Sequence, residues 1–183
     1  MRRRHLLLLL AAVPVACSSP DPALYVLAPL PGASGHGPRI VELREIGLAR
    51  YLERPQIVRS SEAYRLDVLS NEWWGEPLGA MISRVLVQEL TQRLPGSTVF
   101  PESGAITANA AVTVAVNIQR MDPNAAGAVR LIAQVEVQGT TSATRNIDLT
   151  VTPAATGTSG LVAAMSQAIA QLADTIAGMV SRA

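Results

Sequence analysis

The sequence predicts an α+β fold: a single two-layer domain in which an antiparallel sheet packs against two long amphipathic helices. Apolar residues recur every three or four positions over residues 78–94 and again over 161–180, the period of a helix that lies on an apolar surface. Residues 112–119 and 129–137 alternate apolar and polar side chains, as half-buried strands do. A chain of 183 residues is long enough for one core, and with only six aromatic residues that core must consist mainly of aliphatic side chains.

Residues 1–16 are predicted to be the signal peptide of a lipoprotein. Three arginines, Arg2 to Arg4, precede an unbroken apolar run from Leu6 to Val13. This run is too short to span a bilayer, which needs about 20 helical residues. A short apolar run behind positive charges is typical of a secretory signal.

Cys17 is interpreted as the lipidation site. The segment Pro14-Val-Ala-Cys17 resembles a bacterial lipobox, although Pro14 stands where Leu is usual. Cys17 is the only cysteine, and a lone thiol in a secreted protein calls for an explanation. The alternative is an ordinary signal peptide with an incidental cysteine. A diacylglycerol on the thiol and an acyl chain such as palmitate on the amine would give three chains, enough for stable anchoring. By the sorting rules of similar lipoproteins, Ser18 directs the protein to the outer membrane.

Residues 17–38 are expected to form the lipidated cysteine and a flexible tether, and residues 39–183 the periplasmic domain. Proline, glycine, serine and alanine dominate the tether. Its exception is Tyr25-Val-Leu27, a candidate edge strand that would dock the tether on the domain. Further strands are expected over residues 40–46, 56–60 and 63–69, and Pro55 excludes a regular helix or a central strand between the first two.

A helix is predicted from Leu78 to Leu94, ended by Pro95-Gly96. Pro77 suits its first turn, and Glu76 places negative charge at the positive end of the helix dipole. One face of the helix is apolar. The opposite face is assigned to solvent and carries Ser83, Arg84, Gln88, Glu89, Gln92 and Arg93.

The remaining elements follow in order. A short strand is expected over residues 98–100 and a loop over 102–109. The two alternating runs are joined by Asp122-Pro-Asn124 and Gly127, which predicts an antiparallel hairpin. A third strand is expected over 144–151. Ser159 is the expected cap of a closing helix.

The sequence offers little catalytic chemistry. Both histidines, His5 and His36, fall in the signal and the tether, so a Ser-His-Asp or Cys-His arrangement and a histidine-based metal site are not expected in the domain. No phosphate-binding glycine loop occurs. From Cys17 onward 12 arginines face 14 acidic residues, a side-chain net charge of −2, so nucleic acid is not an expected partner. We therefore expect a non-enzyme without a cofactor or a metal.

Two groups of residues admit a structural and a functional interpretation. Trp73 and Trp74 either close one end of the core or present an aromatic contact surface to a protein partner. Tyr51 and Leu52, with Arg54 and Pro55, form either a packed loop or a docking edge. The sequence favours the structural interpretation for the tryptophans.

The segment Tyr51-Leu-Glu-Arg-Pro-Gln-Ile-Val58, followed by Trp74-Gly-Glu-Pro-Leu78 at the head of a helix, resembles the PqiC/YmbA-type ABC transport auxiliary lipoproteins. In that family a Tyr-Leu-x-Arg-Pro-Gln-Ile-Val segment follows a strand, and Trp-Ala-Glu-Pro-Leu opens the first long helix. Gly75 replaces the usual Ala. The lipobox, a Tyr-x-Leu element and the closing helix agree in order.

The resemblance implies an outer-membrane lipoprotein that faces the periplasm of a Gram-negative bacterium and belongs to a trans-envelope lipid transport system. Its implied partners are an MCE-domain protein, whose tunnel it would dock at the outer membrane, and further copies of itself in a homo-oligomer. Carried over by residue, Cys17 is the lipid site. Tyr51, Leu52, Arg54, Pro55, Trp74, Glu76 and Pro77 are motif positions that support the fold or contact a partner.

Two alternatives remain at this stage. The chain could carry a lipid or another apolar ligand between helix and sheet, or it could be a passive envelope-integrity lipoprotein without a transport partner. A gene neighbourhood encoding an MCE protein and an ABC permease would separate the transport role from both.

Overall fold

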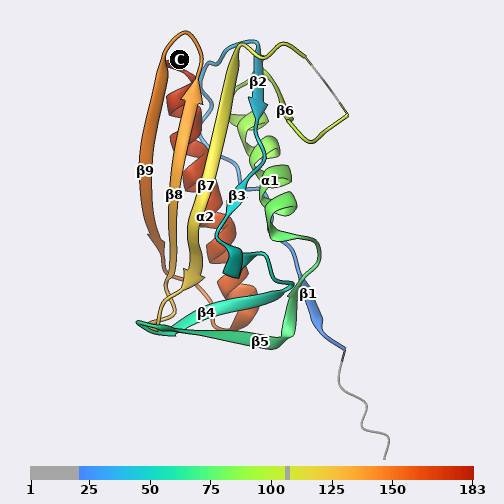
Figure 1. Cartoon of the computed structure of the whole chain (residues 1–183), viewed down its shortest axis with the longest axis vertical. Helices are drawn as coiled ribbons and strands as arrows, with labels where there is room; N and C mark the ends of the chain where they lie inside the picture. The colour runs from blue at the N-terminus through green and yellow to red at the C-terminus, as the bar shows by residue number, and fades with distance from the viewer. Residues whose placement is uncertain (1–20, 106–107) are drawn as a thin grey trace, which may run out of the picture.

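The computed structural model describes residues 21–105 and 108–183, which form a mixed α/β domain of two helices and two sheets (Figure 1). Cys17 and the signal peptide lie outside the described residues. A tall six-stranded sheet stands in front of both helices, and a smaller three-stranded sheet closes one end of the molecule. The described chain begins at that end, and the C-terminus lies at the opposite end.

The large sheet has the order β6-β2-β7-β8-β9, with β3 paired to β7 off this path. Its strands are β2 (Ile40–Leu43), β3 (Gly47–Leu48), β6 (Thr98–Pro101), β7 (Val112–Pro123), β8 (Val129–Gln138) and β9 (Ser142–Val151).

The predicted hairpin is confirmed: β7, β8 and β9 are antiparallel, as expected for strands joined by short turns. The purely antiparallel sheet is wrong, because β2 runs parallel to both β6 and β7, and β3 runs parallel to β7. The return path from β2 to β6 passes through the small sheet and a helix, which is the long crossover that parallel strands require. The alternation of apolar and polar side chains along a strand does not show whether its neighbours run parallel or antiparallel to it.

The helices are α1 (Leu78–Arg93) and α2 (Gly157–Val180), and both cover the same face of the large sheet. They differ in length, 16 against 24 residues, so the expectation of two long helices holds only for α2. The cap of α2 is Thr156 rather than Ser159. The inward side chains of β7 and β8 and the facing side chains of the helices are almost all fully buried, among them Val114, Leu131, Leu86 and Ile169. One core therefore fills the space between sheet and helices.

The small sheet has the order β1-β5-β4 and crosses the end of the large one (Figure 1). Its strands are β1 (Ala23–Tyr25), β4 (Gln56–Glu62) and β5 (Arg65–Trp74), and the single-turn 3₁₀ helix η1 (Arg50–Leu52) precedes β4. The predicted edge strand around Tyr25 is thus present, parallel to β5. Strand β5 runs five residues further than expected and ends on the two tryptophans.

The described part of the expected flexible tether is instead packed on the domain. Leu27 is only 2% exposed, and its N–H lies 3.1 Å from the Met81 sulfur on α1. The Ala28 N–H donates to the Ser166 hydroxyl on α2 at 3.1 Å. The Gly35 N–H donates to the Arg93 carbonyl at 2.6 Å. Because proline- and glycine-rich sequence also suits a fixed extended segment that runs over two helices, composition alone could not distinguish the two.

Candidate functional site

The two sequence motifs meet beside β1 at one end of the molecule. The Trp74 N–H donates to the Pro55 carbonyl at 2.7 Å, and the Gly75 N–H donates to the Tyr25 carbonyl at 2.8 Å. We call this place the motif junction and define it as Tyr51–Pro55 and Trp73–Pro77 together with Tyr25. The Tyr-x-Leu element and both long motifs, far apart in sequence, therefore form one structural unit.

The two tryptophans have different roles at the junction. Trp74 is 7% exposed and belongs to the core. Trp73 is half-buried, and its indole N–H donates to the Ser70 carbonyl at 2.8 Å. The structure thus supports the core interpretation for Trp74. The ring of Trp73 is more accessible, and it is therefore the tryptophan available for contact with a protein partner.

Tyr51 joins the junction to the large sheet through a buried carboxylate. Its hydroxyl donates to Asp122 at 3.0 Å, and the Ser60 hydroxyl donates to the other oxygen of the same carboxylate. The guanidinium of Arg120 donates to Asp122 at 2.9 Å. Asp122 is 1% exposed. Burial and the neighbouring Asp122 charge both raise the pKa of Tyr51 well above its usual range, so the hydroxyl stays a donor.

This corrects the sequence-based placement of Asp122, which was assigned to the connecting turn. It lies in β7, and the turn begins after Pro123. Asp-Pro-Asn is a common turn sequence, so local pattern favoured the loop. Three donors from η1, β4 and β7 make the buried strand position favourable instead.

Leu52, Glu76 and Pro77 stabilise the local structure of the junction. Leu52 is 2% exposed in the core. Pro77 occupies the N-cap position of α1, and its carbonyl accepts the Met81 N–H at 3.0 Å. Glu76 precedes the helix and forms an exposed ion pair with Arg84. The predicted placement of Glu76 and Pro77 at the helix start is therefore confirmed to within one residue.

Arg54 and Pro55 remain on the surface of the junction. Both side chains are exposed, as is Pro77. Among the residues that the structure describes, Arg54 takes part in no side-chain hydrogen bond or ion pair. The presence of arginine at position 54 is therefore not explained by a contribution of its side chain to the stability of the domain.

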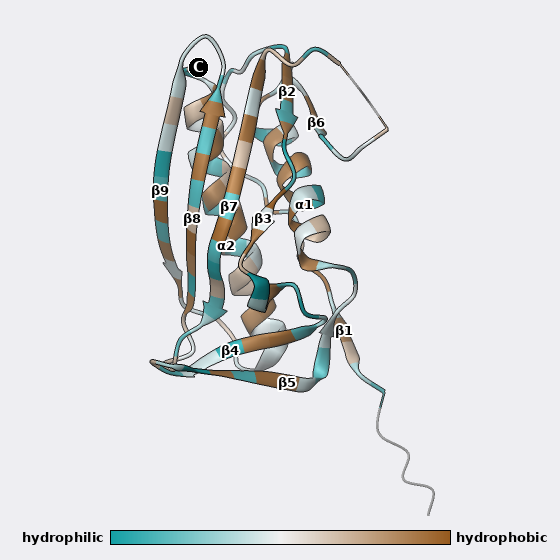
Figure 2. Cartoon of the chain, in the orientation of Figure 1, coloured by the Kyte–Doolittle hydropathy of each residue, from teal (hydrophilic) through white to brown (hydrophobic). Residues whose placement is uncertain are grey.

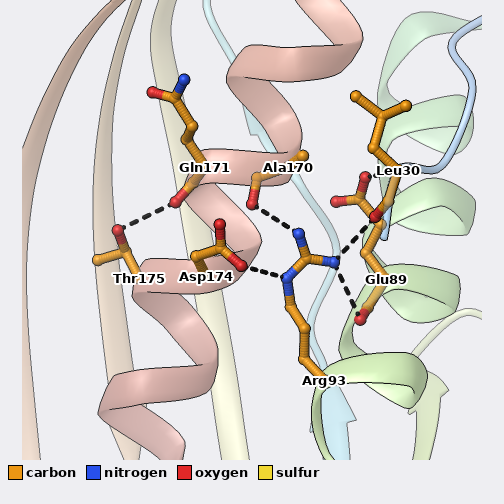
Figure 3. A network of polar contacts seen from close by, with 7 residues as sticks. All are labelled: Leu30, Glu89, Arg93, Ala170, Gln171, Asp174 and Thr175. Carbon is orange, nitrogen blue, oxygen red and sulfur yellow. Dashed lines mark hydrogen bonds and ion pairs between the residues drawn. The ribbon is translucent and has the colours of Figure 1, made fainter. Parts of the chain in front are cut away.

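A second polar cluster lies between the helices, where the expected solvent-facing residues Glu89 and Arg93 are fully buried (Figure 3). The Arg93 guanidinium donates to Asp174 on α2 at 2.6 Å, to the Leu30 carbonyl at 3.1 Å and to the Ala170 carbonyl at 3.1 Å. Placing these side chains in solvent was wrong, because the 28–37 segment covers the face of α1 that the sequence left open.

Glu89 completes this cluster from the same helix. One of its carboxyl oxygens accepts the Leu30 N–H at 2.8 Å, while the other has no partner in the described chain. Burial raises the pKa of Glu89 to about 7, opposed by the Leu30 N–H and by Arg93. Arg93 and Asp174 then form the ion pair, and Glu89 is neutral below about pH 7.

A surface hollow of about 740 Å³ lies between the small sheet, the β7–β8 turn and the start of α2, and it is lined mainly by small and polar residues. Residues 21–105 and 108–183 bring no three His, Cys, Asp or Glu side chains together to hold a metal. No helix in the same ranges is long and apolar enough to cross a membrane.

Comparison with known proteins identifies the family. The family model described as "ABC-type transport auxiliary lipoprotein component" matches residues 25–177, from the Tyr-x-Leu element to the last turn of α2. This chain belongs to that auxiliary lipoprotein family. The resemblance inferred from the motifs is confirmed. Membership supports a transport-associated role in the cell envelope.

Solved structures share the fold. A protein whose crystal structure is described only as uncharacterised aligns with a TM-score of 0.76 and 20% identity over 88% of this chain and all of that one. A Xanthomonas campestris protein of the DUF330 family aligns with a TM-score of 0.70 and 16% identity over 86% of this chain and 93% of its own. No curated protein matched. These identities establish the fold alone.

Sequence reasoning found the motif segments of this auxiliary lipoprotein, but it did not predict that they meet in the fold, and it missed the two buried polar clusters. Arg93 and Glu89 are four residues apart on α1, a spacing that also suits a solvent-exposed pair, so nothing local marks them. Only a weak indication of the Asp122 cluster is present in the sequence: the hydroxyl of Tyr51 in the motif needs a hydrogen-bond partner if it is buried. Only tertiary structure supplies that partner.

Proposed function

We propose that this chain is the outer-membrane lipoprotein subunit of a trans-envelope lipid transport system, where it docks the tunnel of an MCE-domain protein. The family match over residues 25–177 carries the proposal. The exposed side chains of the motif residues Arg54, Pro55 and Pro77 form the contact surface, and within the described residues the Arg54 side chain has no hydrogen bond or ion pair. The chain acts by binding and not by catalysis, as a homo-oligomer.

Co-purification with an MCE-domain protein from the same organism tests the contact surface. Arg54→Ala should reduce co-purification several-fold without changing the melting temperature. Arg145→Ala is the matched control, because Arg145 is also exposed but lies on β9, away from the junction. Equal co-purification of both variants with wild type would remove Arg54 from the interface. The mass of the isolated domain in solution tests the homo-oligomer.

The anchor is tested separately. The mature protein should begin at lipidated Cys17 and fractionate with the outer membrane, and Cys17→Ser should accumulate as a larger, unlipidated precursor. Intact-mass analysis that finds an unmodified thiol at Cys17 would contradict the anchor.

The non-catalytic role has its own test. Any Asp or Glu substitution should act through stability or partner binding. A carboxylate variant that folds, binds its partners and yet abolishes a measured turnover would show catalysis.

The carrier alternative is less favoured. In the described residues, buried apolar side chains from the helices and the large sheet form one continuous core between the two layers, which supports a structural core there more than a lipid site.

A further inference from the structure

The exposed apolar side chains of this protein are concentrated on one element. Within the described ranges, five large hydrophobic residues are substantially exposed, and all lie on the small sheet or directly beside its strands: Leu24, Val26, Tyr64, Leu66 and Val68. Leu24 is 66% exposed, and Tyr64, in the β4–β5 turn, is completely exposed. Figure 2 shows apolar stretches along β4 and β5 at this end of the molecule. Exposed apolar residues gathered in one region mark an interaction surface.

The same end of the molecule receives the chain from the predicted anchor. The described chain begins at Asp21 and enters β1, which pairs with the end of β5. Three residues lie between Cys17 and Asp21, and the four Cα–Cα steps that join the two span at most about 14 Å even when fully extended.

Packing of residues 27–37 on the helices sets this short distance. The carbonyl of Leu30 accepts from buried Arg93 at 3.1 Å, and the Gly35 N–H donates to the Arg93 carbonyl at 2.6 Å. A tether free as far as residue 38 could reach roughly 75 Å and would let the domain stand away from the membrane. The observed tether is packed on the helices from residue 27, so it does not allow this separation.

The charges of the hairpin are compatible with a lipid surface. Asp67 accepts from Arg65 at 3.0 Å and lies 3.7 Å from Arg59, and Glu62 lies 3.9 Å from Arg65. Two basic and two acidic side chains therefore balance toward the β4–β5 turn, which lowers the cost of approach to lipid there. The third acid of the hairpin, Glu72, lies near the other end of β5 and accepts from the Thr158 hydroxyl. Tyrosine and arginine are also side chains that place an apolar body in the membrane interface while the polar end stays hydrated.

We propose that the small sheet β1-β5-β4 is the membrane-contacting face of this protein, with Tyr64, Leu66 and Val68 in the headgroup region of the leaflet that holds the Cys17 lipid. This inference rests on the anchor in the proposed function and adds an orientation to it. The large sheet then stands upright on the membrane, and the C-terminal end of α2 points away from it.

Depth-dependent quenching tests this orientation. Acylation would occupy the only native thiol, so an introduced cysteine can be labelled selectively with a fluorophore. Lipidated Leu66→Cys protein is placed in vesicles of phosphatidylethanolamine with a minority of phosphatidylglycerol, some carrying a headgroup nitroxide. Ser142→Cys is the control, an exposed position at the opposite end of the large sheet. Quenching should be several-fold stronger at position 66 than at position 142.

Each other outcome contradicts the proposal. Equal quenching at the two positions would exclude a membrane-facing small sheet. Energy transfer between labels at position 66 on different molecules, without lipid quenching, would assign the surface to a second copy of the chain. Tyr64→Cys, labelled in the same way and compared with Ser142→Cys, repeats the measurement if Leu66→Cys is unstable.

The experiment also separates this inference from the proposed function. Lipidated protein that co-purifies with its transporter but shows no preferential quenching overturns the orientation alone. An unmodified Cys17 overturns the anchor and the orientation together.

Discussion

Arg93 shows how a single side chain can fix a long segment. It is fully buried and binds α2 through Asp174 and the covering segment through Leu30. Asp174 is half-exposed, so the larger loss in an Arg93 variant is the donor to the carbonyls of Leu30 and Ala170. A buried acceptor left without its partner typically costs about 1–3 kcal/mol. Arg93→Met should therefore lower the free energy of unfolding by this order and expose residues 27–37 to proteolysis. Urea denaturation and limited proteolysis measure both effects. Arg84→Met, at an exposed ion pair of the same helix, should cost less than about 1 kcal/mol.

Glu89 predicts a pH dependence of stability. Its folded pKa of about 7 lies above the ordinary pKa of 4.5 for a glutamate, so the folded protein binds this proton more tightly than the unfolded chain. Stability should be greatest below the unfolded pKa, fall as the pH rises toward about 7, and level off above it. Arg93 and Asp174 are the charged groups that face Glu89. In Glu89→Gln this decline should shrink, as melts from pH 5 to pH 8 would reveal. An unchanged decline would assign it to other groups.

Tyr51 provides a test of the buried Asp122 cluster. Tyr51→Phe removes one donor to a carboxylate that is 1% exposed, which should cost about 1.5–3 kcal/mol because the acceptor is charged. Tyr64→Phe is the matched control, because Tyr64 is fully exposed and should melt like wild type. Equal melting temperatures for the two variants would show that the Tyr51 hydroxyl does not stabilise the fold.

At the scale of elements, the start of α1 combines core packing with surface charge. Trp74→Ala should cost about 3–5 kcal/mol, as for other large buried aromatics. Glu76→Ala removes only an exposed pair beside the helix start and should cost about 0.3–1 kcal/mol. Trp73→Ala should change stability less than Trp74→Ala. Thermal melts rank the three, and a Trp74→Ala protein that melts like wild type would contradict the core assignment.

At the scale of the whole molecule, the segment before β2 acts as part of the domain. Leu27 fills the core, and β1 completes the small sheet. A chain truncated to residues 38–183 should therefore melt well below one that begins at residue 18, and it should bind hydrophobic dyes more strongly. Calorimetry of the two chains decides this. Equal stability would mean that the segment is a passive tether after all.

The sequence by itself determined the helices, the β7–β8–β9 hairpins and the two motif segments. Each of these depends on short-range periodicity, turn residues or a family motif, so nearby residues report them. Strands β4 and β5 were also predicted, but β5 was predicted to end five residues too early. Asn71 and Glu72 resemble loop sequence, and the end of β5 is a strand because it pairs with β1.

Only the tertiary structure decided which polar residues are buried, which strands run parallel and where the tether ends. Glu89 and Arg93 are polar residues on a helix whose other face is apolar, so the local pattern places them in solvent. In the fold, residues 28–37 and α2 supply the hydrogen-bond partners that make their burial favourable. The parallel pairing of β2 with β6 and β7 depends on a crossover of more than fifty residues, beyond any local pattern. Burial and strand direction are settled by neighbours distant in sequence, because desolvation is compensated only where those neighbours meet.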